Sequence, residues 1–140
     1  MDELQELGRL IKRAQWQHHR LLDSRLRSAA GITIVQWDAL RAIEREPGAS
    51  ARRLAAETFQ SEQSFGVMAS GMERRGLIVR TRGQGRAHEH RVTDEGRRML
   101  ELGSAFATEV LQNSVGRLDA RQRSALRGLL ETVLDDEPPD

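Results

Sequence analysis

Apolar side chains recur at helical spacing along most of the chain, and the clearest pattern lies between Ser61 and Gly76. Four apolar residues step through this segment by three and four positions, which places them on one face of a helix: Phe65, Met68, Ala69 and Met72. Ser61 is expected to cap the start of this helix, and Gly76 is expected to end it. The other faces carry mainly small and polar side chains, which allow the helix to approach another surface closely.

The residues that follow predict a β-hairpin. Residues 77–79 are apolar and suit a short strand, whereas residues 80–86 form a glycine-punctuated tip that carries three arginines. Residues 87–92 suit the return strand, and Thr93 is expected to cap the next helix. A helix, a second helix and a basic hairpin follow one another in a winged helix-turn-helix, a motif whose second helix enters the major groove of DNA.

Two more helices are predicted before the one that Ser61 caps. The second helix of the chain is expected from about residue 34 to residue 45, with four side chains pointing inward: Val35, Ala39, Leu40 and Ile43. The next helix is short, and Ser50 is expected to cap it. Its pattern places Leu54 and Ala55 inward and Arg52 and Arg53 outward.

Long apolar stripes flank the motif on both sides. Residues 2–27 predict one long helix with a narrow stripe, residues 94–115 predict another, and Asp119 is expected to cap a last helix. One small winged-helix core cannot cover all three stripes, so a second copy of the chain is the expected neighbour. The predicted partner is therefore the chain itself, in a homodimer.

The predicted fold class is mainly α with a small β-hairpin. At 140 residues the chain is expected to form a single domain, residues 1–140. In this domain a winged helix-turn-helix, residues 32–98, is flanked by long dimerisation helices in residues 1–30 and 99–136.

Charge is distributed unevenly, although the formal net charge is only +1. Residues 48–98 contain ten basic and six acidic side chains, whereas residues 99–140 contain four basic and eight acidic ones. A phosphate-facing surface requires this asymmetry, because phosphate neutralisation supplies most of the sequence-independent affinity for nucleic acid. The expected macromolecular partner is double-stranded DNA.

Several classes of protein are excluded by what the sequence lacks. There is no cysteine, so disulfides, thiolate metal sites and cysteine-based redox sensing are excluded. No apolar run approaches the ~18 residues of a membrane span, and the polar N-terminus does not resemble a signal peptide, so we expect a cytoplasmic protein without a membrane partner. No nucleophile–base set, paired carboxylates or phosphate loop is present, and we expect neither enzymatic activity nor a cofactor.

Two runs of sequence carry a family resemblance. Residues 72–80, MERRGLIVR, together with an arginine-rich wing and residues 92–98, VTDEGRR, resemble the MarR family of bacterial transcriptional regulators. The resemblance covers nearly the whole chain and implies a dimeric repressor that releases a pseudo-palindromic operator when a small ligand binds. The wing departs from the family pattern. Arg86 stands where the family has an arginine, but Gln84 replaces the aspartate usually found two residues before it.

The resemblance and the charge pattern together single out ten residues for DNA binding. Gln63, Ser64 and Val67 are expected at base edges, and Arg82 and Arg86 in or beside the minor groove. Five others are expected to bind phosphates: Arg52, Arg53, Ser61, Arg74 and Arg75.

Members of the resembled family often bind small aromatic or phenolic ligands between the dimerisation helices and the DNA-reading module. Five residues are candidates to line such a cleft, with the arginines meeting a carboxylate: Trp16, His19, Arg20, Trp37 and Arg41. The alternative interpretation is that both tryptophans pack in the core or in the dimer interface.

Two other functions remain open at this point. Winged helices also serve as protein-interaction modules. His88 and His90 lie two residues apart and would share one face of a strand, which also fits a metal-responsive regulator. No third ligand is evident, so no metal site is assigned.

Overall fold

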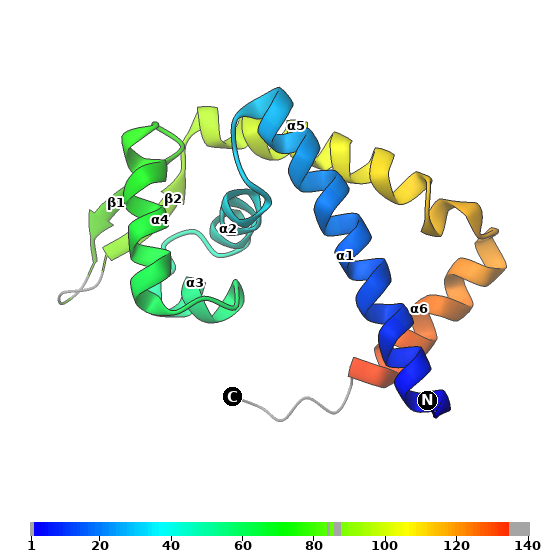
Figure 1. Ribbon diagram of the computed structural model, residues 1–140. Helices are drawn as coiled ribbons and strands as arrows, with labels where there is room; N and C mark the ends of the chain where they lie inside the picture. The colour runs from blue at the N-terminus through cyan, green and yellow to red at the C-terminus, as the bar shows by residue number, and fades with distance from the viewer. Residues whose placement is uncertain (1, 84, 86–87, 135–140) are drawn as a thin grey trace.

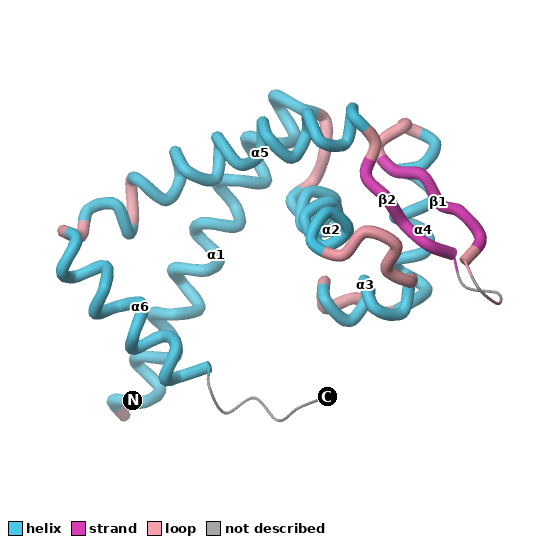
Figure 2. The backbone as a smooth tube through the Cα atoms, turned by 180° about the vertical axis from the view of Figure 1, so that it is seen from behind, coloured by secondary structure: helices cyan, strands magenta, loops and turns pink. Residues whose placement is uncertain are grey.

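The computed structural model describes residues 2–83, 85 and 88–134. It is mainly helical, with one antiparallel hairpin, and this confirms the predicted fold class (Figures 1 and 2). The elements in chain order are α1 (Glu3–Ala30), α2 (Ile34–Arg45), α3 (Ala51–Glu57), α4 (Glu62–Arg74), β1 (Ile78–Arg82), β2 (His88–Val92), α5 (Asp94–Gln112), a single 3₁₀ turn (Val115–Arg117) and α6 (Ala120–Leu134).

The elements divide into a head and an arm. The head contains α2, α3, α4 and the β1–β2 hairpin, which is the wing of the motif (Figure 1). The arm contains α1, α5 and α6, and both the N-terminal end of α1 and helix α6 lie far from the wing (Figure 1). Helices α1 and α5 pack against each other and against α2, so they connect the arm to the head.

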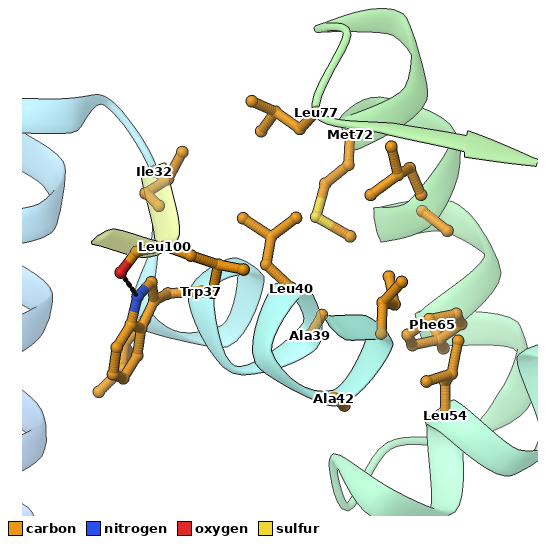
Figure 3. Close-up of a cluster of buried hydrophobic side chains, with 14 of the residues drawn as sticks. Ile32, Trp37, Ala39, Leu40, Ala42, Leu54, Phe65, Met72, Leu77 and Leu100 are labelled. Carbon is orange, nitrogen blue, oxygen red and sulfur yellow. Dashed lines mark hydrogen bonds between the residues drawn. The ribbon is translucent and has the colours of Figure 1, made fainter. Parts of the chain in front are cut away.

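The core of the head is formed by side chains from each of its helices (Figure 3). Leu40 of α2, Leu54 of α3, and Phe65 and Met72 of α4 are all fully buried. Burial of each such side chain contributes about 1.5–3 kcal/mol to folding. This packing fixes α4 on the head, and it leaves the opposite face of α4 free of core contacts.

Four predicted helix caps are confirmed. The cap oxygen accepts a hydrogen bond from the amide three residues later in each case: Ser50 from Arg53 at 3.2 Å, Ser61 from Ser64 at 3.1 Å, Thr93 from Gly96 at 3.1 Å and Asp119 from Gln122 at 2.8 Å. Gly76 follows α4 with a left-handed φ of 75°, as expected for a residue that ends a helix.

Several predicted boundaries were wrong. The first helix continues to Ala30, and the residue that ends it is Gly31, with a left-handed φ of 66°. The first strand spans Ile78–Arg82 rather than residues 77–79, because its pairing with the return strand continues to Arg82 opposite His88. Helix α5 ends at Gln112 rather than at residue 115, where a 3₁₀ turn replaces its last turn.

The predicted inward position of Val35 was also wrong, since its side chain is 41% exposed. The core-facing side of α2 is formed instead by Ile34 and Trp37 together with Ala39, Leu40 and Ile43. Val35 lies on the first turn of α2, on the side that lines a groove with residues of α4. Among the residues described, no helix is both long and apolar enough to span a membrane.

Candidate DNA interface and ligand cleft

Helix α4 presents an outward face made of short polar and apolar side chains. Its inward face is fixed by Phe65, Ala69 and Met72, which are fully buried. Helical periodicity then turns Gln63, Ser64 and Val67 outward, and all three are exposed. The three residues line one shallow groove with the first turn of α2, so the structure brings together the predicted base-reading set.

The exposed arginines around α4 differ in the partners that they already have. Arg52 and Arg74 are exposed on α3 and α4. Arg53 lies 3.0 Å from Glu46 and 3.6 Å from Glu57, and its hydrogen bond to Glu46 raises its pKa above the ordinary arginine value. A phosphate would therefore compete with two carboxylates for Arg53.

The other predicted DNA contacts are Arg75, expected at a phosphate, and the two wing arginines, expected at the minor groove. The guanidinium of Arg75 donates to the carbonyl of Gly31 at 2.8 Å, so this side chain connects the end of α4 to the end of α1. Arg82 is exposed at the end of β1. Arg86, the other predicted wing contact, lies outside the described residues.

An ion pair that the sequence analysis missed attaches the wing to α4. The guanidinium of Arg80 donates to Glu73 at 3.1 Å and to Ser70 at 3.0 Å, and the amide of Arg80 donates to Glu73 at 3.1 Å. The hydrogen bond from the Arg80 side chain lowers the pKa of Glu73 below the ordinary glutamate value. The wing and α4 are therefore held in one orientation.

The two wing histidines have different environments. His90 is buried, its Nδ1 donates to the carbonyl of Ala49 at 2.9 Å, and its ring packs edge-to-face with Phe65 at 5.7 Å between centroids. Burial lowers the pKa of His90 below the ordinary histidine value. His88 is exposed at the outer end of β2. No group of three potential metal ligands occurs among the residues that the structure describes.

A separate cleft of about 300 Å³ lies where α1, α2 and α5 meet. Of the five residues predicted to line a ligand cleft, the structure brings together His19, Trp37 and Arg41. Trp16 and Arg20 do not line it, although the ring of Trp16 stacks on His19 with 5.6 Å between centroids. Residues that the sequence analysis did not select complete the wall: Gln15, His18, Leu22, Ile34, Asp38, Ala107, Val110 and Leu111.

Three neighbouring residues of the cleft contact one another or the backbone: Trp37, Asp38 and Arg41. Trp37 is 3% exposed, and its indole nitrogen donates to the carbonyl of Leu100 at 3.3 Å (Figure 3). The guanidinium of Arg41 lies over the Trp37 ring at 4.5 Å and 3.7 Å from Asp38. Burial raises the pKa of Asp38 above the ordinary aspartate value, although Arg41 opposes this shift. The cleft thus offers a cation, a carboxylate and an aromatic ring in a small volume.

Comparison with known proteins identifies this arrangement. Residues 30–87, which include the whole of α2, α3, α4 and β1, match the family model described as MarR family. This part of the chain is similar to the MarR family. No curated protein sequence is similar enough to count as a match.

Solved structures of transcriptional regulators extend the match beyond the head. The transcriptional repressor CouR, bound to a 23-mer DNA duplex, is 29% identical, with a TM-score of 0.78 over 96% of this chain and 96% of that chain. The PcaV transcriptional regulator from Streptomyces coelicolor, in complex with its natural ligand, is 25% identical, with a TM-score of 0.76 over 97% of this chain and 96% of that one. A MarR-family regulator from Rhodococcus sp. RHA1 has the same fold, with a TM-score of 0.81 over 95% of both chains at 21% identity. The chain therefore has the fold of a MarR-family transcriptional regulator throughout the described residues.

Proposed function

We propose that this protein is a homodimeric, sequence-specific DNA-binding repressor that releases its operator when a small aromatic ligand binds. The observation that carries the proposal is the outward face of α4, whose exposed polar and apolar side chains lie among exposed arginines. Short polar and apolar side chains read the edges of bases, whereas arginines bind phosphates. CouR, which shares this fold over nearly its whole length, binds a DNA duplex.

In this proposal the three outward residues of α4 read bases. The amide of Gln63 pairs with a base edge, and Ser64 and Val67 contact the neighbouring positions. Arg82 and Arg86 extend from the wing toward the minor groove. The phosphate contacts are Arg52, Arg53, Ser61, Arg74 and Arg75. Ser61 already caps α4, so it would act together with the amides at the start of that helix.

The homodimer follows from apolar side chains that the described residues leave uncovered. Near the start of α1, Leu4 is 80% exposed and Ile11 is 51% exposed. In α6 no side chain is buried, and Leu129 and Val133 are 66% and 67% exposed. Burial of such surface is the main driving force for association. Residues 1–30 and 99–136 would form the interface, and residues 32–98 would form the two DNA-reading heads.

The dimer would place two α4 helices about one DNA turn apart, ~34 Å, and would require a pseudo-palindromic operator. The cleft beside Trp37 and Arg41 lies where the arm meets the head. An aromatic acid could stack there and bond to the guanidinium of Arg41. Because α1 and α2 both line the cleft, a ligand would change the spacing between the two heads. The PcaV structure, with its natural ligand bound, supports a ligand site in this fold.

The proposal is tested by mobility shift with DNA from upstream of the gene, at two salt concentrations. Retention of one fragment over competitor DNA supports a sequence-specific regulator. We expect Gln63→Ala to change which DNA sequence is preferred, with little change in the salt dependence of the affinity. Arg82→Ala should instead reduce the slope of log K against log salt by about one. A protein that binds no fragment in a salt-dependent way would instead be a winged-helix protein-interaction module.

The oligomer and the ligand are tested on the same protein. Sedimentation should give twice the chain mass, and Leu129→Glu in α6 should shift the protein toward monomer. In the mobility-shift assay, aromatic acids should release the DNA, and Arg41→Ala should abolish that release without abolishing DNA binding. A monomeric wild-type protein would contradict the dimer, and release that survives Arg41→Ala would contradict the ligand site.

A further inference from the structure

The groove beside α4 is free of charged side chains. Its volume is about 560 Å³. It is formed by the first turn of α2, the end of the turn between α3 and α4, and the outward face of α4. Its eight lining residues are Thr33, Val35, Gln36, Gln60, Gln63, Ser64, Val67 and Met68. None of them is charged, although 31% of the residues of the chain are. A surface that met only phosphates would carry cations, so this lining suits the edges of bases.

Two valines from different helices are exposed in this groove. Val35 on α2 is 41% exposed, and Val67 on α4 is 71% exposed. Neither side chain belongs to the buried core of the head, which is complete without them. Each valine exposes a branched apolar side chain to water. This exposure is unfavourable in free energy, and contact with an apolar partner would remove that penalty.

The orientation of Val35 is fixed before any partner binds. Thr33 and Gln36 form a reciprocal cap at the start of α2, in which the Gln36 amide donates to Thr33 Oγ1 at 3.1 Å. In return, the Thr33 amide donates to Gln36 Oε1 at 2.9 Å. This cap orders the turn that carries Val35, so the valine is presented to the groove by a regular and well-anchored helix start.

We propose that Val35 and Val67 bind the 5-methyl group of thymine in the major groove, and that the first turn of α2 is therefore part of the base-reading surface. Thymine is the base that presents an apolar group there, and valine side chains are its chemical complement. The adenine of the same pair presents a donor and an acceptor, which match the side-chain amide of Gln63. The inference rests on the proposed DNA binding, and it specifies A·T pairs in each half-site.

We take DNA to be the partner that fills the groove, because the groove is continuous with the outward face of α4. Gln63, Ser64 and Val67 belong at once to the groove and to the face of α4 that would enter DNA. A recognition helix in the major groove, which is about 12 Å wide, brings whatever lies against its outward face close to the same base pairs. Val35 is the apolar side chain of α2 that lies there.

The test removes single methyl groups from the DNA. A duplex is selected from a random library by the wild-type protein, and each thymine in it is then replaced singly by deoxyuridine. Fluorescence anisotropy measures the affinity for each duplex. Loss of one buried methyl group should weaken wild-type binding about fourfold at one or two positions in each half-site. In Val35→Ala or Val67→Ala protein, the penalty at the corresponding position should disappear.

Val79→Ala provides the matched control. Val79 is 46% exposed on β1 and does not line the groove, so this variant should keep the full deoxyuridine penalty. The inference is overturned if no deoxyuridine weakens wild-type binding, if both groove variants keep the penalty, or if the selected half-sites contain no A·T pair. Failure to select any duplex would overturn the proposed function as well, and that outcome is distinct from selection without dependence on the methyl group.

Discussion

Replacement of Gly103 by alanine should destabilise the protein by crowding Trp37, a tryptophan that lines the proposed ligand cleft. Gly103 is buried in α5, where its Cα hydrogen faces the Trp37 indole. A Cβ atom added there would stand 2.5 Å from Cδ1 and 2.7 Å from Cε2 of that ring, and closer still to Nε1. The indole cannot easily move away, because it is 3% exposed and donates a hydrogen bond to Leu100.

Three contributions determine the expected change in the free energy of unfolding. Overpacking a core costs about 1–3 kcal/mol. A weakened indole hydrogen bond costs about 1 kcal/mol more. Alanine is favoured over glycine within a helix by about 1 kcal/mol, which acts in the opposite direction. The net expectation is a loss of about 1–3 kcal/mol in the free energy of unfolding, or a melting temperature lower by about 3–10 °C for a chain of this size.

Urea unfolding followed by tryptophan fluorescence, at one fixed protein concentration, measures this loss. The matched control is Gly66→Ala in α4, where an added Cβ would meet nothing within 4 Å. The control should be as stable as wild type or more stable, because it retains only the helix-propensity gain. If Gly103→Ala is equally stable, the close packing of Gly103 on Trp37 is refuted.

Three further predictions concern the head. Phe59 has a left-handed φ of 56° and is 97% exposed, so Phe59→Gly should raise the free energy of unfolding by up to about 1 kcal/mol, whereas Phe59→Ala, which keeps the strain, should not. The backbone amide of Arg80 donates to the Glu73 carboxylate at 3.1 Å, so Glu73→Ala should accelerate hydrogen exchange at that amide. An unchanged exchange rate would refute the role of this contact in attaching the wing to α4. The lowered pKa of His90 means that the unfolded state gains a proton first as pH falls below about 6.5, so stability should be full above that pH and should decrease toward pH 5. His90→Asn, which can still donate to the carbonyl of Ala49, should lose this pH dependence; an unchanged dependence would assign it to another group.

The helix starts could be predicted because their cause is local. Ser50, Ser61 and Thr93 each satisfy an amide three residues ahead, so the sequence contains both partners of the interaction. The length of the wing strands could not be predicted from local sequence in this way. Arg82 belongs to β1 because His88 lies opposite it on another strand, and the choice of register is not a local property.

The roles of individual arginines were the least predictable part of the candidate interface. Arg75 was expected to bind a phosphate, yet it donates to the carbonyl of Gly31, 44 positions away along the chain. Arg80 was treated as part of the wing tip, although its guanidinium is hydrogen-bonded to α4. A long, flexible side chain with five donors can reach partners in many directions, so its partner is decided by the tertiary fold rather than by its spacing in the sequence.

For the proposed ligand cleft, helical spacing predicts the lining residues better than residue type does. Helix α1 contributes Gln15, His18, His19 and Leu22, and helix α2 contributes Ile34, Trp37, Asp38 and Arg41. Both sets have the spacing i, i+3, i+4, i+7, so each helix presents one continuous face to the cleft. Trp16 and Arg20 fall outside that spacing on α1, because each lies about 100° around the helix from its predecessor. The selection of aromatic and basic residues by type alone therefore included two that face elsewhere.

Periodicity, applied from Trp37 and Arg41, would also have found Asp38, which changes the expected chemistry of the cleft. An anionic ligand that bonds to Arg41 must displace or share the carboxylate that already lies 3.7 Å from it. Because burial already raises the pKa of Asp38, protonation of that carboxyl is the less costly way to make room. Binding of an aromatic acid should then take up a proton and tighten as pH falls toward the pKa of Asp38. Asp38→Asn should remove both effects while leaving Arg41 on the indole ring, and proton uptake that survives in this variant would assign it to another group.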